Sequence, residues 1–128
     1  MAPLRFRRLW ILLGVLLVLA TLYVCLRPAG TEPPWFPNVD KLQHFTAYLV
    51  LTAWFGALLE RSRYWPLVAA MLALGGGIEV AQGAMALGRT ADLTDVIANA
   101  LGVAAGLGVS LAGRESWLLR IERWLAPT

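Results

Sequence analysis

Residues 9–26 read LWILLGVLLVLATLYVCL, an apolar run of 18 residues without a charged side chain. A helix of ~20 such residues crosses the ~30 Å hydrocarbon core of a bilayer. The whole chain has the same character, because 59% of its 128 residues are apolar and only 15% are charged. In soluble domains about a quarter of the residues are charged. We therefore expect a small integral membrane protein, folded as a single domain over residues 1–128.

Three further apolar runs follow the first. We expect an all-α membrane protein with four transmembrane helices, at about residues 9–26, 42–59, 65–87 and 93–111. The Pro-rich residues 27–39 end the first helix, because proline lacks a backbone N–H and clashes with the preceding turn. Short polar turns separate the remaining runs.

The first run could instead be a cleaved secretory signal, since Arg5, Arg7 and Arg8 precede it. Its apolar part is long for a signal, and no small-x-small cleavage site follows. Residues 22–25 only faintly resemble a lipoprotein cleavage box, because Val24 stands where a small residue is needed. The sequence favours a retained first helix, with the single cysteine, Cys25, packed inside it.

The basic residues predict the orientation, because short cytoplasmic loops retain more Lys and Arg than translocated loops. With four spans, eight basic residues fall on one side, namely Arg5, Arg7, Arg8, Arg61, Arg63, Arg114, Arg120 and Arg123. The other side holds Arg27, Lys41 and Arg89. We therefore expect both termini in the cytoplasm. The basic residues form no stripe, so the net charge of +3 does not indicate binding to nucleic acid.

The end of the chain predicts a short amphipathic helix at residues 117–125. One face carries Trp117, Ile121, Trp124 and Leu125, and the remaining surface carries Arg120, Glu122 and Arg123. Such a helix could lie in the inner membrane interface. An ordinary tail helix explains the same pattern.

Polar residues recur in the expected outer halves of three helices. They are Asp40, Lys41, His44 and Tyr48 in the second, Glu79 and Gln82 in the third, and Asp92, Asp95 and Asn99 in the fourth. Spacings of three and four place each set on one helical face. Polar groups facing lipid cost several kcal/mol each, so we expect the three faces to meet in a polar pocket that opens outward.

Several of these residues also have structural interpretations. Asp92 can cap the fourth helix, with Asp95 as its third-position partner. Asn99 continues into Gly102, Gly106 and Ser110, a small-residue face that brings membrane helices close together. Glycines 75–77 allow a similar approach, or a kink, in the third helix.

Chemical roles follow from the residue types. His44, oriented by Asp40, would be a general base or proton relay, with Glu79 or Asp95 as the partner acid. Without Asp40 on the same helical face, His44 would be interpreted as a structural residue. Arg89 would neutralise the carboxylates or, with Lys41, hold an anionic headgroup. The remaining binding candidates are Tyr48, Gln82, Asp92 and Asn99. The sequence predicts no cofactor and no metal site, and nothing in it supports a zinc site built from one histidine and carboxylates.

The polar residues form three spaced patterns. They read Asp40-Lys41-x-x-His44-Phe45-x-x-Tyr48-x-x-Leu51, Glu79-x-x-Gln82 and Gly88-Arg89-x-x-Asp92-x-x-Asp95-Val96-x-x-Asn99-x-x-Gly102-x-x-x-Gly106. Together they resemble the VanZ-like family over a motif core of about residues 38–108, departing at Leu87, where the family often has proline. The resemblance implies a multi-pass protein of the bacterial inner (cytoplasmic) membrane. Some members are associated with low-level resistance to teicoplanin-type glycopeptides.

Two classes of function fit these features. The pocket would bind or act on a cell-envelope membrane lipid or lipid-linked precursor, which leaves open whether the protein is an enzyme. Alternatively, the protein is a non-catalytic scaffold or binding protein whose polar network is structural. Transport is a weaker third interpretation, since a pathway would need several copies, although the sequence is compatible with an oligomer.

Overall fold

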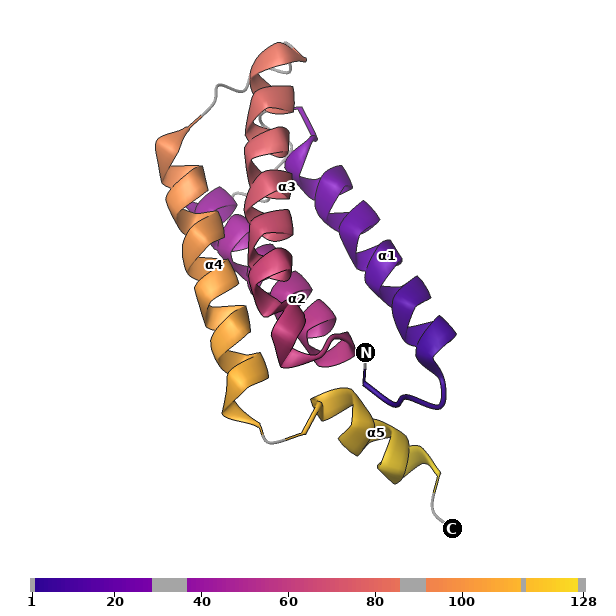
Figure 1. Ribbon diagram of the computed structural model, residues 1–128. Helices are drawn as coiled ribbons and strands as arrows, with labels where there is room; N and C mark the ends of the chain where they lie inside the picture. The colour runs from indigo at the N-terminus through magenta and orange to yellow at the C-terminus, as the bar shows by residue number, and fades with distance from the viewer. Residues whose placement is uncertain (1, 29–36, 86–91, 114, 127–128) are drawn as a thin grey trace.

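The computed structural model describes residues 2–28, 37–85, 92–113 and 115–126, and every regular element in them is helical. These elements are α1 (Arg7–Cys25), α2 (Val39–Leu58), the short 3-10 helix η1 (Arg61–Arg63), α3 (Tyr64–Ala84), α4 (Leu93–Ala112) and α5 (Trp117–Leu125). Helices α1 to α4 alternate in direction, and both ends of the chain lie at the same end of the bundle (Figure 1). We call this the terminal end and the opposite one the distal end.

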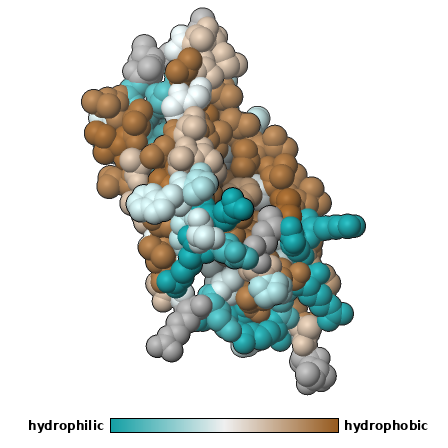
Figure 2. All heavy atoms as spheres, viewed as in Figure 1, coloured by the Kyte–Doolittle hydropathy of each residue, from teal (hydrophilic) through white to brown (hydrophobic). Residues whose placement is uncertain are grey.

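The expected helices are present, but the expectation of four apolar spans is wrong for one of them. Among the described helices, three are long and apolar enough to cross a membrane: α1, η1 with α3 (Arg61–Ala84), and α4. Helix α2 has 20 residues but carries Asp40, Lys41, Gln43 and His44 in its first two turns. Apolar residues cover most of the length of the helices on the face shown in Figure 2, while polar residues gather at the terminal end.

Helices α2 and α4 form the most extensive contact between described elements. Two glycines of α4 make it close: a Cβ at Gly102 would lie 2.4 Å from the Phe45 carbonyl oxygen, and one at Gly106 would lie 2.5 Å from that of Leu49. The small-residue face of α4 therefore packs backbone to backbone against α2, as predicted. Of the three consecutive glycines in α3, only Gly75 meets a neighbour, because a Cβ there would lie 3.0 Å from Asn99 Nδ2.

Helix α1 packs against α2 at its first turns, where Trp10 contacts Trp54, and joins a second apolar cluster at its later turns. Cys25 is buried in an apolar cluster with Tyr48, Leu51 and Ile78, which agrees with the expected packing role of this cysteine. Tyr48 and Cys25 also contact or belong to the polar region at the distal end, so apolar side chains border that region.

Helix α5 forms at the predicted residues, but Glu122, which was expected on the polar surface of the helix, is buried. Leu118 and Glu122 are the buried residues, whereas Trp124 is 88% exposed and Leu125 is also exposed. Both oxygens of Glu122 are used at the start of α1: Oε2 accepts from the Arg5 N–H at 2.7 Å, and Oε1 accepts from the Phe6 N–H at 2.8 Å and the Trp10 indole N–H at 2.6 Å. The first N–H groups of a helix have no partner within it, so Glu122 supplies acceptors to this end of α1.

The first prediction tests the approach of α4 to α2. Gly102→Ala should destabilise the protein by about 1–3 kcal/mol, because the added methyl group forces the helices apart. Gly108→Ala is the matched control in the same helix, since nothing lies within 4 Å of its added Cβ, and it should be neutral within about 0.5 kcal/mol. Thermal unfolding in detergent micelles measures both. Equal midpoints for the two variants would contradict the close packing.

The second prediction concerns Glu122. Burial raises its pKa, but the donated hydrogen bonds from Phe6, Trp10 and Arg5 outweigh burial and hold the pKa below the usual 4.5. A depressed pKa in the folded state means that this stabilisation is present above the unfolded value and is lost as the pH falls through the folded value. Glu122→Gln should destabilise the protein by about 1–3 kcal/mol near neutral pH, because one amide oxygen cannot serve three donors.

Glu115→Gln is the control for Glu122→Gln, since Glu115 forms an exposed ion pair with Arg123 and such pairs contribute about 0–1 kcal/mol. Thermal midpoints are compared from neutral pH to below 4.5. The difference between parent and Glu122→Gln should shrink at the acid end. A difference that stays constant with pH would refute the proposed role of the carboxylate.

Candidate functional site

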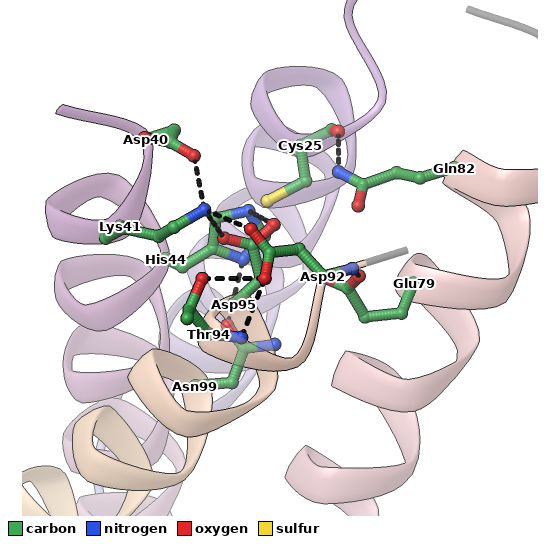
Figure 3. A network of polar contacts seen from close by, with 10 residues as sticks. All are labelled: Cys25, Asp40, Lys41, His44, Glu79, Gln82, Asp92, Thr94, Asp95 and Asn99. Atoms are coloured by element: carbon green, nitrogen blue, oxygen red, sulfur yellow. Dashed lines mark hydrogen bonds and ion pairs between the residues drawn. The ribbon is translucent and has the colours of Figure 1, made fainter. Parts of the chain in front are cut away.

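The polar faces of α2, α3 and α4 meet at the distal end, as the spacing predicts (Figure 3). Helix α2 contributes Asp40, Lys41, His44 and Tyr48, α3 contributes Glu79 and Gln82, and α4 with its cap contributes Asp92, Asp95 and Asn99. We call these nine residues the distal cluster. They come together because α2 and α4 begin, and α3 ends, at this end of the bundle.

The Lys41 ammonium lies among three carboxylates. Its Nζ is 2.8 Å from Asp40 Oδ2, 2.9 Å from Asp92 Oδ2 and 2.6 Å from Asp95 Oδ1. An ammonium has three donors and no acceptor, so these contacts use its full capacity. Lys41 therefore joins the start of α2 to the start of α4, and its expected role in holding an anionic headgroup would require it to release a carboxylate.

Asp92 combines the two interpretations that its sequence position allowed. Its Oδ1 accepts from the Thr94 N–H at 2.9 Å and the Thr94 hydroxyl at 2.7 Å, which caps α4. Its Oδ2 faces Lys41. The hydrogen bond from Lys41, followed by those from Thr94, holds the pKa of Asp92 well below its ordinary value of 3.8. This carboxylate is therefore charged throughout the physiological pH range.

His44 is oriented by Asn99 and not by Asp40 in the described contacts. Its Nδ1 lies 2.9 Å from Asn99 Oδ1, and its Nε2 lies 3.8 Å from Asp95 Oδ2. Asp40 instead contacts Lys41, one turn closer to the distal surface. The acid that faces the imidazole is therefore Asp95, one of the two partner acids predicted for it.

Glu79 links α3 to the cap of α4 and is itself buried. Its Oε2 accepts from the Asp92 N–H at 3.1 Å, whereas its Oε1 is buried and has no hydrogen-bond partner among the described residues. In the part of the chain that the structure describes, the Tyr48 hydroxyl and the amide nitrogen of Asn99 are also buried without partners. Unpaired buried polar atoms are uncommon in native structures and call for an explanation.

Gln82 has a structural partner. Its side-chain amide donates to the Cys25 carbonyl oxygen at 2.6 Å, which ties the end of α3 to the end of α1. This contact satisfies a carbonyl left open at the end of a helix. Gln82 therefore holds the distal end together. Arg89, together with Leu87 and Gly88, lies outside the described residues.

Exposure decreases from the rim of the distal cluster to its centre. The side chains of Asp40 and Asp92 are 34% and 42% exposed, and that of Lys41 is 26% exposed. Asp95 and His44 fall to 7% and 3%. The centre, formed by His44, Glu79 and Asp95, combines a basic nitrogen with carboxylates in a shielded place, an arrangement suited to proton transfer or to holding a cation.

Sequence analysis missed three partners in this region. Thr94 belongs to the cap, and the Asp-x-Thr spacing at Asp92 could have indicated it. The pairing of His44 with Asn99 and of Gln82 with the Cys25 carbonyl could not be read from spacing, because the partners lie on different helices.

A family model described as VanZ/LLP1 matches residues 6–114. The chain belongs to the VanZ/LLP1 family. No curated protein and no solved structure matches it. The VanZ/LLP1 match extends from the start of α1 to the end of α4 and so includes the whole distal cluster, whereas the described part of α5 follows it.

Proposed function

We propose that this VanZ-family protein binds the polar headgroup of a cell-envelope lipid or lipid-linked precursor at the distal cluster. The observation that carries the proposal is the buried centre of the cluster, where His44, Glu79 and Asp95 lie at one end of a bundle with three membrane-capable helices. Ionisable residues within membrane helices are costly, and they normally mark a site of function.

The charge of the distal cluster favours a headgroup that is rich in hydrogen-bond donors. Four carboxylates, those of Asp40, Glu79, Asp92 and Asp95, surround Lys41 and His44, and the Lys41 ammonium already contacts three of them. The groups of the described cluster that are still free to form hydrogen bonds are therefore mostly acceptor oxygens. Hydroxyl and ammonium groups, such as those of the sugar and peptide parts of a lipid-linked precursor, suit such a surface.

An apolar groove beside the cluster supports a lipid as the ligand. It lies between α1 and α2, has a volume of about 520 Å³, and is lined by residues that include Leu17, Thr21, Val24, Leu42, Thr46 and Val50. Arg27 and Val39 extend the groove to the distal end. An acyl chain in the groove would leave its headgroup close to the cluster.

In this proposal α2 is a fourth membrane crossing, and the protein lies in the bacterial cytoplasmic membrane with both termini in the cytoplasm. The polar face of α2 is covered by α4 and α3, since His44 and Tyr48 are buried. A helix whose polar face is covered can lie in a membrane despite its modest hydropathy. The distal cluster would then open toward the outer leaflet, where teicoplanin-type glycopeptides meet envelope precursors.

A structural role for the network is the second candidate. It is favoured by the contacts that bridge helices, since Lys41, His44 and Glu79 each contact a residue of α4 or its cap. In that case the cluster would hold the helices in register, and loss of a member would lower the amount of folded protein.

The third prediction separates these candidates. His44→Gln and Glu79→Gln should leave the amount of membrane-inserted protein near that of the parent, but should abolish a teicoplanin-resistance phenotype and the co-purification of a specific lipid. Both changes replace the titratable group with an amide of similar size. Abundance is measured by immunoblot, resistance by growth in teicoplanin, and bound lipid by native mass spectrometry.

Arg123→Ala, which changes an exposed residue of α5, is the control and should behave as the parent. A loss of abundance that parallels the loss of phenotype would favour the structural candidate. Only bulk lipid in the parent would contradict headgroup binding. Anionic phospholipid that is retained by the parent and lost from Arg89→Ala would point to Arg89 as a headgroup-binding residue.

The fourth prediction concerns orientation. Single cysteines introduced as Arg61→Cys and Arg89→Cys, in a Cys25→Ser background, should react differently with a membrane-impermeant maleimide. Residue 89 should be labelled in intact spheroplasts and residue 61 only after permeabilisation, because basic residues concentrate on the cytoplasmic side. Labelling of both from the same side would rule out the proposed crossing pattern.

A further inference from the structure

Three potential metal ligands converge at the centre of the distal cluster. His44, Glu79 and Asp95 are all buried, and one ligand atom from each lies within 4.8 Å of the others. They come from α2, α3 and α4, so no short motif in the sequence displays them. The set goes beyond an acidic cluster, because it includes an imidazole nitrogen.

The hydrogen bond between His44 Nδ1 and Asn99 leaves Nε2, the other ring nitrogen, available to bind a metal ion. Asn99 Oδ1 is an acceptor, so Nδ1 of His44 carries the proton and donates across 2.9 Å. In the neutral ring Nε2 then has a lone pair, which faces Asp95 Oδ2 at 3.8 Å. A lone pair opposite a carboxylate oxygen is repulsive unless a proton or a metal ion lies between the two atoms, and a divalent ion can fill that place. Metal-binding histidines are commonly oriented through their other nitrogen in this manner.

The two carboxylates each keep one oxygen available. Glu79 uses Oε2 for the Asp92 N–H, and its Oε1 is buried with no partner in residues 2–28, 37–85, 92–113 and 115–126. Asp95 uses Oδ1 for Lys41, and its Oδ2 faces His44. Each side chain is therefore held by one oxygen, and its second oxygen makes no hydrogen bond to a described residue.

We propose that His44 Nε2, Glu79 Oε1 and Asp95 Oδ2 form a binding site for a divalent transition-metal ion, with Zn²⁺ the best match. One imidazole nitrogen and two carboxylate oxygens suit Zn²⁺, whereas Mg²⁺ and Ca²⁺ prefer sites made of oxygen alone. A divalent cation also balances the two carboxylate charges. The inference concerns the same cluster as the proposed function but does not require that a lipid binds there.

The observed spacing is compatible with binding after a small contraction. Ligand atoms around a tetrahedral Zn²⁺ lie about 3.4 Å apart, given metal–ligand distances of about 2.1 Å. One ligand atom from each of the three residues lies within 4.8 Å of the others, so binding requires the three side chains to move closer together by about 1 Å. Three protein ligands leave a fourth position open, as in catalytic zinc sites.

The fifth prediction tests the site on the purified full chain in detergent micelles, stripped of metal with EDTA. Titration with ZnCl₂ should give about one ion per chain, and His44→Gln, Glu79→Gln and Asp95→Asn should each weaken binding by at least about tenfold. Bound zinc is measured by elemental analysis and isothermal titration. Glu115→Gln is the matched control, since it removes an exposed carboxylate at the opposite end of the bundle.

A second measurement uses the parent alone and therefore does not depend on how well the variants fold. ZnCl₂ should raise the thermal midpoint and EDTA should reverse the shift, because a ligand that binds the folded state stabilises it, whereas MgCl₂ should have no such effect. An unchanged midpoint, no saturable binding, or equal binding by parent and ligand variants would overturn the proposal. Lipid co-purification is measured separately, so failure of the metal site is distinguishable from failure of headgroup binding.

Discussion

The close approach of α4 to α2 is the constraint on which the rest of the structure depends. At Gly102 and Gly106 the two backbones come so near that a Cβ would overlap carbonyl oxygens of α2. Small residues permit such contact between membrane helices. Because the contact sets the relative height and rotation of α2 and α4, it also places His44 opposite Asn99, and Lys41 beside Asp92 and Asp95. The packing motif and the polar cluster are therefore parts of one arrangement.

The cluster shows how charge is tolerated inside a mostly apolar bundle. At the rim, the Lys41 ammonium compensates carboxylates that still reach solvent. Deeper in, His44, Glu79 and Asp95 are shielded and only partly satisfied within the described residues. Removing one partner from such a group costs more than the pair contributes, since the other charge stays buried. A ligand that supplies the missing partners of this buried centre gains more binding free energy there than it would at a hydrated surface.

The sequence predicts much of the fold, because apolar runs and helical spacing are local properties. Helix α4 begins at the predicted Leu93 and α5 has the predicted bounds. Contacts between helices are different, because they depend on how the elements are rotated against each other. Asp40 was expected to orient His44, yet it lies one turn too near the rim and contacts Lys41. Glu122 was assigned to a polar face, but its position beneath α1 is set by residues more than 100 positions earlier.

The contact between Glu122 and the start of α1 has a consequence for how the protein is made. During synthesis α1 emerges first, and its opening N–H groups meet their acceptor only after α5 has been translated. The contact between the first and last described helices can therefore form only after α5 has been made. Before that step, α1 is held by its contacts with α2, such as the hydrogen bond from the Trp54 indole to the Trp10 carbonyl oxygen. Fusions or truncations at the C-terminal side therefore act on the stability of the opposite end of the chain.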